Sequence, residues 1–195
     1  MKLLKKISDK VLPTLFWLCV MLAFDSLSVC IITLISAAAH ELGHIFAAFL
    51  VKRGDISLPR ATFFGLKIDT GSLLSYKDEA IIASGGPIAN LCVFIVSLPF
   101  FAISEYAIAL GFINLFTAIT NLLPIHGYDG ERILRSALLK KWDVRIADCV
   151  SDALTLALSS SLSVISLVFI MVLGEGWWIF AFFFSILLGE VLKRH

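Results

Sequence analysis

Long apolar runs separated by short polar segments dominate the chain. Six runs predict membrane-spanning helices, at residues 11–24, 27–51, 79–103, 106–123, 150–173 and 177–192. Between the second and third runs, residues 56–74 alternate in part between apolar and polar positions, which is typical of one or two short strands. A later polar stretch, residues 131–148, has a helical composition and is expected to lie along the membrane surface. The pattern predicts an all-α polytopic membrane protein of about six transmembrane helices with one short strand-like segment.

The composition supports a membrane location. Of the 195 residues, 59% are hydrophobic and 16% are charged, whereas soluble domains contain about 45–50% apolar and about 25% charged residues. The mean hydropathy is +0.95. This excess of apolar residues excludes an isolated soluble domain, and the low charge excludes disorder and coiled coil. The lipid bilayer is therefore the first expected partner.

The basic residues predict an orientation. With six spans, all 16 lysines and arginines fall on one side of the membrane, and the short turns on the other side contain none. Because cytoplasmic loops are enriched in Lys and Arg, both termini and the basic loops are expected to be cytoplasmic. The first run is expected to be a retained span, since no small-residue cleavage site follows it. The net charge of +1 argues against a nucleic-acid partner.

The second apolar run contains the sequence H-E-L-G-H at residues 40–44. On a helix, His40 and His44 lie on one face and can bind one metal ion, and Glu41 can act as a general base on a water molecule. Ionisable residues inside a membrane span are costly and are functional by default. The sequence therefore predicts a metal site within this span, rather than histidines that only satisfy neighbouring helices.

A catalytic zinc ion usually has three protein ligands and one water, so a third ligand must come from elsewhere. The candidates are His126, Asp129 and, at the end of the chain, His195. Asp129 follows the fourth run in a segment that Pro124 and glycines keep from being helical, so it can reach the depth of His44. On spacing, Asp129 is favoured over His126, although it could also simply cap the following helix.

Asn90 and Asn121 are uncharged polar residues in apolar runs. Asn90 follows a stretch of small residues at 84–89, which suits close packing against the histidine helix, and Asn121 ends the fourth run. Either amide could hydrogen-bond a substrate backbone or an oxyanion. An interhelical hydrogen bond that only supports the bundle explains each of them equally well.

Three elements on successive spans resemble the site-two protease family of intramembrane zinc metalloproteases. They are H-E-L-G-H at 40–44, G-G-P-x-x-N at 85–90 and N-x-x-P-x-x-x-x-D-G at 121–130. The resemblance covers residues 13–135, and the short length and cytoplasmic termini look most like the branch around stage IV sporulation protein FB. It implies one integral-membrane metalloprotease domain over residues 1–195, with a catalytic core at 27–135 and two further spans at 150–192.

The resemblance also implies roles for single residues. His40, His44 and Asp129 would bind one zinc ion per chain, Glu41 would be the catalytic base, and Asn121 would lie at the active site. The family cleaves transmembrane segments of membrane-tethered proteins, often precursors of transcription regulators. The expected partners are therefore a transmembrane protein substrate and regulatory membrane proteins, and the expected location is a bacterial cell membrane.

The sequence departs from the family pattern at three places. Gly127-Tyr128 stands where Pro-Leu is common, and Glu131 stands where a second glycine is common. These changes alter the contacts around Asp129 without removing a ligand. The carboxy-terminal nucleotide-sensing CBS domain of the sporulation branch does not follow, so the ATP regulation of that branch is not expected.

Two other functional classes fit the composition. A catalytically silent relative would bind a membrane partner, but it should have lost Glu41 or a metal ligand, and this chain has kept them. A metal transporter would carry polar ligands on several spans along a path, whereas the first, fifth and sixth runs offer few beyond serines 159–161. Intramembrane proteolysis is the interpretation that uses all the motif residues.

Overall fold

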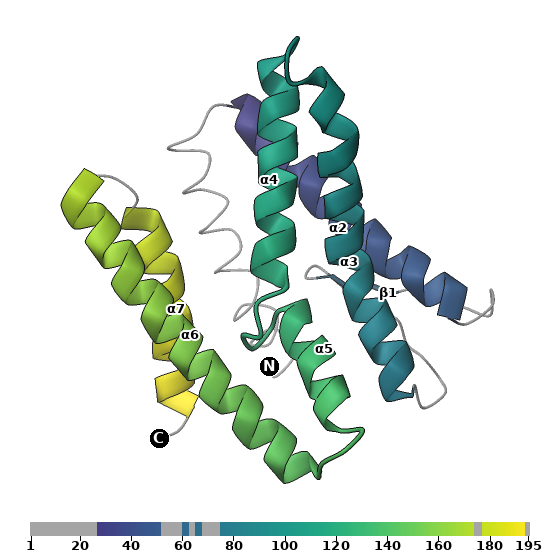
Figure 1. The fold of residues 1–195 in the computed structure, drawn as a ribbon, viewed down its shortest axis with the longest axis vertical. Coiled ribbons are helices and arrows are strands. Elements are labelled where there is room, and N and C mark those ends of the chain that lie inside the picture. The colour runs from purple at the N-terminus through teal and green to yellow at the C-terminus, as the bar shows by residue number, and fades with distance from the viewer. Residues whose placement is uncertain (1–26, 52–59, 63–64, 68–74, 174–176, 194–195) are drawn as a thin grey trace, which may run out of the picture. The chain divides into compact units, whose positions relative to one another are not determined.

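The computed structural model describes residues 27–51, 60–62, 65–67, 75–173 and 177–193 (Figure 1). The chain divides into two compact units, residues 1–121 and residues 122–195. The expected first span, at 11–24, lies outside the described residues. A single domain over residues 1–195 stays a prediction.

The described part of the first unit contains three long helices and a short strand pair. Its described elements are α2 (Leu27–Val51), β1 (Arg60–Thr62), β2 (Gly65–Lys67), α3 (Tyr76–Ser97), the 3₁₀ turn η1 (Leu98–Phe100) and α4 (Glu105–Asn121). Helix α2 packs against both α3 and α4, and α3 and α4 run side by side as a hairpin (Figure 1). This three-helix packing brings the two asparagine-bearing helices against the histidine helix.

The boundaries of these helices follow local signals. The predicted second span and α2 have the same bounds. Helix α3 begins earlier than predicted because Ser75 and Asp78 form a capping box, in which each side chain accepts a hydrogen bond from the other's backbone N–H. Helix α3 ends at Ser97 and is followed by the 3₁₀ turn η1, which ends at Phe100, before the predicted end of the third span at 103. Pro99 lies in the first turn of η1, where its missing N–H is tolerated.

The predicted strand-like segment is confirmed in its described part. Strands β1 and β2 pair in antiparallel register, with Arg60 opposite Lys67 and Thr62 opposite Gly65. The pair lies beside α2. The rest of residues 56–74 lies outside the described residues.

The second unit contains α5 (Asp129–Leu138), α6 (Val144–Leu173) and α7 (Trp177–Lys193), and α6 packs against the other two. The stretch at residues 131–148 is largely helical, as its composition predicts, but it is not one helix, and its place along the membrane surface stays a prediction. A turn at residues 139–143 separates α5 from α6, and α6 starts six residues before the predicted span at 150. The first turns of α6 are polar because they carry partners of α5, such as Asp148, which pairs with Arg135. Their polarity therefore resembles that of a surface segment.

The described helices are those of an integral membrane protein. Three of them are long and apolar enough to cross a membrane, namely Leu27–Val51, Tyr76–Phe100 and Val144–Val172. Large apolar side chains such as Leu42, Phe46 and Val168 are exposed on these helices, as expected where lipid rather than water is the solvent. Helices α4 and α7 have 17 residues each, so six spans stay a prediction.

Candidate metal centre

The two histidines of the H-E-L-G-H sequence meet on one face of α2. The Nε2 atoms of His40 and His44 are 3.1 Å apart. Their rings meet edge to face, with centroids 4.7 Å apart and an interplanar angle of 87°. The helical spacing of four residues therefore produces the predicted convergence of two imidazoles.

A buried amide holds His40 from the other side of its ring. The Oδ1 atom of Asn90 lies 2.6 Å from Nδ1 of His40. The side chain of Asn90 is 0% exposed, and its amide nitrogen donates to the Ser36 carbonyl at 3.0 Å, the Ser36 hydroxyl at 3.3 Å and Asn114 Oδ1 at 2.7 Å. The structure thus gives Asn90 a positioning contact with His40, and a contact between Asn90 and substrate stays a prediction.

The direction of these hydrogen bonds fixes the tautomer of His40. Asn114 donates its own amide N–H to the Leu110 carbonyl, at 2.8 Å, so its oxygen is the atom that faces Asn90. Carbonyl oxygens can only accept, so Asn90 presents its NH₂ group to Asn114 and Ser36 and its oxygen to His40. Nδ1 of His40 must therefore carry the proton, which leaves Nε2 as the nitrogen with a lone pair.

His44 is fixed in the same tautomer by the main chain. Its Nδ1–H donates to the Ile82 carbonyl of α3 at 2.8 Å. Two neutral rings that both carry their proton on Nδ1 would face each other with lone pairs on Nε2, at 3.1 Å. A shared proton or a metal ion near both Nε2 atoms would stabilise this approach. Since neutral imidazole nitrogens held by second hydrogen bonds are typical zinc ligands, His40 and His44 fit a metal ion.

Glycines where α2 and α3 cross leave room for the two histidine rings. A Cβ atom added to Gly86 would lie 2.5 Å from His44 Nε2 and 2.6 Å from His40 Nε2. A Cβ at Gly85 would meet the Gly43 carbonyl and the Ala47 side chain, the latter at 2.7 Å. Glycine is thus required where the helices cross and where the Nε2 atoms point.

Glu41 follows His40 on α2 and is half-buried. A residue next to a ligand on a helix points about 100° away from it around the axis, so it can reach a group bound near the ligand without binding the metal itself. This placement agrees with a base beside the histidine pair, and the catalytic role of Glu41 stays a prediction.

Asp129 belongs to the second unit, where it is the first residue of α5 and is 7% exposed. The preceding Gly127 has φ +92°, a left-handed conformation that favours glycine, and Tyr128 is extended. Arg132 Nη1 lies 3.5 Å from Asp129 Oδ1, one turn along α5. Burial raises the pKa of the Tyr128 hydroxyl from 10.0 to about 12.

The other predicted residues have distinct surroundings. His126 donates from Nε2 to Asp152 Oδ1 of α6 at 2.8 Å, so its ring is held within the second unit. Asn121 is the last residue of α4 and donates to the Thr117 carbonyl at 2.9 Å. His195 lies outside the described residues.

Sequence reasoning missed three groups that orient the histidines: Ser36, the Ile82 carbonyl and Asn114. Two of them had a signal in the sequence. Ser36 precedes His40 by four residues and so shares its helix face, and Asn114 is a polar residue in an apolar run, seven residues or two turns before Asn121. A main-chain carbonyl has no such signal.

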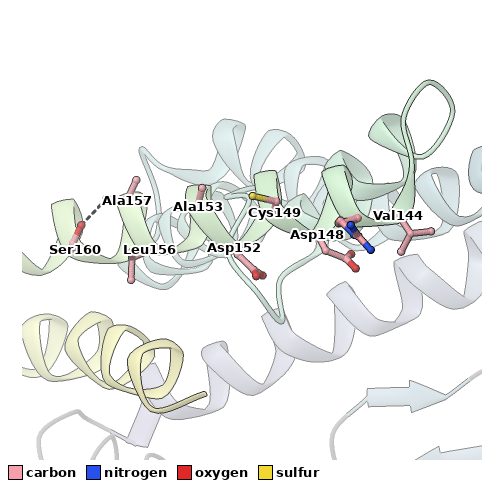
Figure 2. Close-up of a pocket in the computed structure, with 9 residues that line it drawn as sticks. Val144, Asp148, Cys149, Asp152, Ala153, Leu156, Ala157 and Ser160 are labelled. Atoms are coloured by element: carbon pink, nitrogen blue, oxygen red, sulfur yellow. Dashed lines mark hydrogen bonds between the residues drawn. The ribbon is translucent and has the colours of Figure 1, made fainter. Parts of the chain in front are cut away.

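A hollow of about 960 Å³ lies along α6 (Figure 2). Its described lining residues come from α6, between Val144 and Ser160, and include Arg145, Asp148 and Asp152. None of the described site residues predicted from the sequence lines it.

Comparison with known proteins places the fold. No protein-family model matches the sequence, and no curated protein matches it. Among solved structures, the chain is similar to the Site-2 Protease from Methanocaldococcus jannaschii, with a TM-score of 0.61 and 22% sequence identity. The similarity covers 95% of this chain and 87% of that chain. The chain therefore has the fold of a site-2 protease.

Proposed function

We propose that the chain is an intramembrane zinc metalloprotease that hydrolyses peptide bonds in or near the transmembrane segment of a membrane-tethered protein. The observation that carries the proposal is the histidine pair of α2, in which both Nδ1 atoms face hydrogen-bond acceptors and both Nε2 atoms face each other. The fold similarity to a site-2 protease supports the same reaction class.

The proposed metal ligands are His40, His44 and Asp129, which offer two imidazole nitrogens and one carboxylate oxygen. This donor set suits zinc, which in catalytic sites takes three such ligands and leaves one position open. His126 is a weaker candidate because its ring already donates to Asp152. One zinc ion per chain is expected.

Glu41 is the proposed general base. When bound, zinc would polarise the scissile carbonyl and lower the pKa of a water molecule toward about 7. Glu41 would accept the proton of the attacking water and pass it to the leaving amine. Asn121, whose amide has a second N–H beyond the one given to Thr117, would donate to the oxyanion that forms on the substrate.

The strand pair is the proposed substrate-binding element. A peptide must be unwound before its bonds can be hydrolysed, and an exposed strand edge can hold a peptide extended by main-chain hydrogen bonds. Strands β1 and β2 form a two-stranded sheet beside the histidine helix. The proposed substrate is a single-span membrane protein such as a regulatory precursor, and regulatory membrane proteins are proposed as further partners.

The proposed orientation puts both termini and the basic loops in the cytoplasm of a bacterial cell, because all 16 basic residues then lie on one side. Membership of the sporulation branch is a finer proposal that depends on the substrate. Reporter fusions at both termini test the orientation, and activity of both reporters on the cytoplasmic side is the expected result.

The test of the reaction compares wild type with Glu41→Gln, both co-expressed with single-span membrane proteins. New termini are detected by mass spectrometry of the membrane fraction, and the zinc content of each purified protein is measured. The expected result is that Glu41→Gln abolishes cleavage and keeps its zinc, because the substitution removes the base and leaves the ligands. Cleavage that survives in Glu41→Gln would show that the assigned base is wrong.

A further inference from the structure

We propose that His126, Glu131 and Asp152 form a positioning clamp that holds Asp129 in place through helix α6. The clamp comprises these three residues with Ser151 and Thr155. It rests on the proposed role of Asp129 as a metal ligand. All of its contacts lie within the second unit.

The first half of the clamp lies before Asp129. His126 makes two hydrogen bonds to α6. Its ring donates from Nε2 to Asp152 Oδ1 at 2.8 Å, and its backbone N–H donates to Thr155 Oγ1 at 3.1 Å. Residues 152 and 155 are neighbours on one face of a helix. Both the side chain and the main chain of His126 are therefore set by the same patch of α6.

The second half of the clamp lies after Asp129. Ser151 donates to Glu131 Oε1 at 3.0 Å, and the same oxygen lies 3.8 Å from His126 Nδ1. The residues three before and two after Asp129 are thus both tied to one turn of α6. They are also close to each other.

The short segment between the two halves has little freedom to move. Tyr128 donates its backbone N–H to the Ile125 carbonyl at 3.0 Å, and Ile125 is 0% exposed. Gly130 lies so close to the backbone of Leu122 and Leu123 that no Cβ would fit there. A shift of the clamp would therefore pass to Asp129 rather than be absorbed by the loop.

The members of the clamp are exposed to different degrees. Ser151 and Thr155 are fully buried, and the side chains of Glu131 and His126 are 13% and 26% exposed, whereas Asp152 is 49% exposed. Asp152 also lines the hollow along α6 (Figure 2). Replacing Asp152 should therefore perturb the clamp without opening a cavity in the core.

Helix α6 supplies a matched control one turn earlier. Asp148 is also 49% exposed, lines the same hollow (Figure 2) and accepts a hydrogen bond from Arg135 Nε at 2.9 Å. This pair holds the last turn of α5, which is about 9 Å along the helix from Asp129. Asp148 contacts the last turn of α5, whereas Asp152 contacts His126 in the segment that precedes α5. Only Asp152 therefore lies at the end of α5 that carries Asp129.

The experiment measures zinc affinity of the full-length protein in detergent by competition with a chelator, and the visible absorption spectrum after loading with Co²⁺. Asp152→Ala is expected to weaken zinc binding by about 10-fold, the lower end of the range for groups that orient metal ligands, because Asp152 acts on Asp129 through His126, and to alter the Co²⁺ spectrum. Asp152→Asn keeps an oxygen that accepts from His126 and should restore most of the affinity. Asp148→Ala should leave the affinity within about twofold, because its partner Arg135 lies at the end of α5 that is distant from Asp129.

Equal affinities of Asp152→Ala and wild type, or an equal loss in Asp148→Ala, would overturn the clamp. If Asp152→Ala does not fold, Thr155→Val is the second test. This substitution removes the acceptor of the His126 backbone N–H and should also weaken zinc binding. Wild-type affinity in Asp129→Ala is a different failure, because it would refute the proposed ligand itself. The two outcomes are distinguishable since Asp129→Ala is measured beside the clamp variants.

Discussion

The histidine region and the Asp129 region are held in different ways. Around His40, the partners are side chains in the interior of apolar helices, and Asn90 and Asn114 are both 0% exposed. Around Asp129 lie a turn with one left-handed glycine and the partly exposed side chain of Arg132, and the preceding His126 pairs with the partly exposed Asp152. The first region depends on buried amides, and the second depends on backbone shape and contacts near the surface.

This difference predicts different consequences of mutation. A polar group left without its partner inside apolar helices costs about 1–3 kcal/mol, because no water can replace the lost hydrogen bond. At a partly exposed site, the remaining group is less completely enclosed by protein and the cost is about 0–1 kcal/mol. Changes around His40 should therefore lower both stability and metal affinity, whereas changes around Asp129 should lower mainly metal affinity.

The largest effect is expected from Gly86→Ala. The added Cβ would lie within 2.6 Å of both Nε2 atoms of His40 and His44, so it would occupy the space that a metal needs. Zinc affinity should fall by about 100-fold or more, the upper end for changes near a ligand. Gly189→Ala in α7 is the matched control, because nothing lies within 4 Å of its added Cβ. Normal zinc binding by Gly86→Ala would contradict the described site.

The next effect separates metal affinity from stability at Asn90. Asn90→Ala leaves His40 Nδ1–H and Asn114 Oδ1 without their partner, so thermal stability and zinc affinity should both fall, the latter about 10-fold or more. Asn90→Asp keeps the oxygen that accepts from His40 but loses the NH₂ group, so it should lose stability while keeping more zinc affinity. Thermal unfolding and chelator competition measure the two quantities. Equal zinc affinities in both variants would argue against the tautomer assignment.

A smaller effect is expected from two glycines beside Asp129. Gly130→Ala would drive a Cβ into the Leu122 and Leu123 carbonyls, so it should displace the start of α5 and weaken zinc binding about 10-fold. Gly127→Ala places its Cβ in open space and costs only the left-handed backbone strain of about 1–2 kcal/mol. Zinc titration of both variants makes the comparison, and a greater loss in Gly127→Ala would contradict it.

The smallest effect should have the opposite sign. Arg132 lies 3.5 Å from Asp129 Oδ1 and its side chain is 41% exposed, so it competes weakly with a metal for that carboxylate. Arg132→Ala should raise zinc affinity, by no more than about fivefold, the equivalent of 1 kcal/mol for an exposed pair. A marked loss of zinc in this variant would mean that Arg132 supports the site rather than competes with it.

The sequence predicted the histidine region better than the Asp129 region. Helix α2 has the predicted bounds and brings His40 and His44 together, because the spacing of a motif on one helix needs no tertiary information. The sequence could not show the partners of Asn90, because an asparagine amide can hydrogen-bond either to a neighbouring helix or to a substrate. Contacts made by main-chain atoms, such as the Ile82 carbonyl, depend on helix crossing and leave no pattern.

The start of α6 shows why the second unit was harder to predict. Residues 144–148 carry Arg145 and Asp148, whose polarity suits a surface segment as well as the first turns of a long apolar helix. The ion pair between Arg135 and Asp148 links helices separated by a turn, and this pairing cannot be deduced from periodicity. The hydrogen bond from His126 to Asp152 is equally hidden in the sequence, because Asp152 belongs to no motif.

The zinc content of detergent-purified protein tests the central claim most directly. It is measured for wild type, His40→Ala and Asp129→Ala by elemental analysis, with folding checked by gel filtration and circular dichroism. We predict about one zinc ion per wild-type chain, lost in both variants, as expected for three protein ligands. A well-folded wild type that binds no zinc would contradict the account.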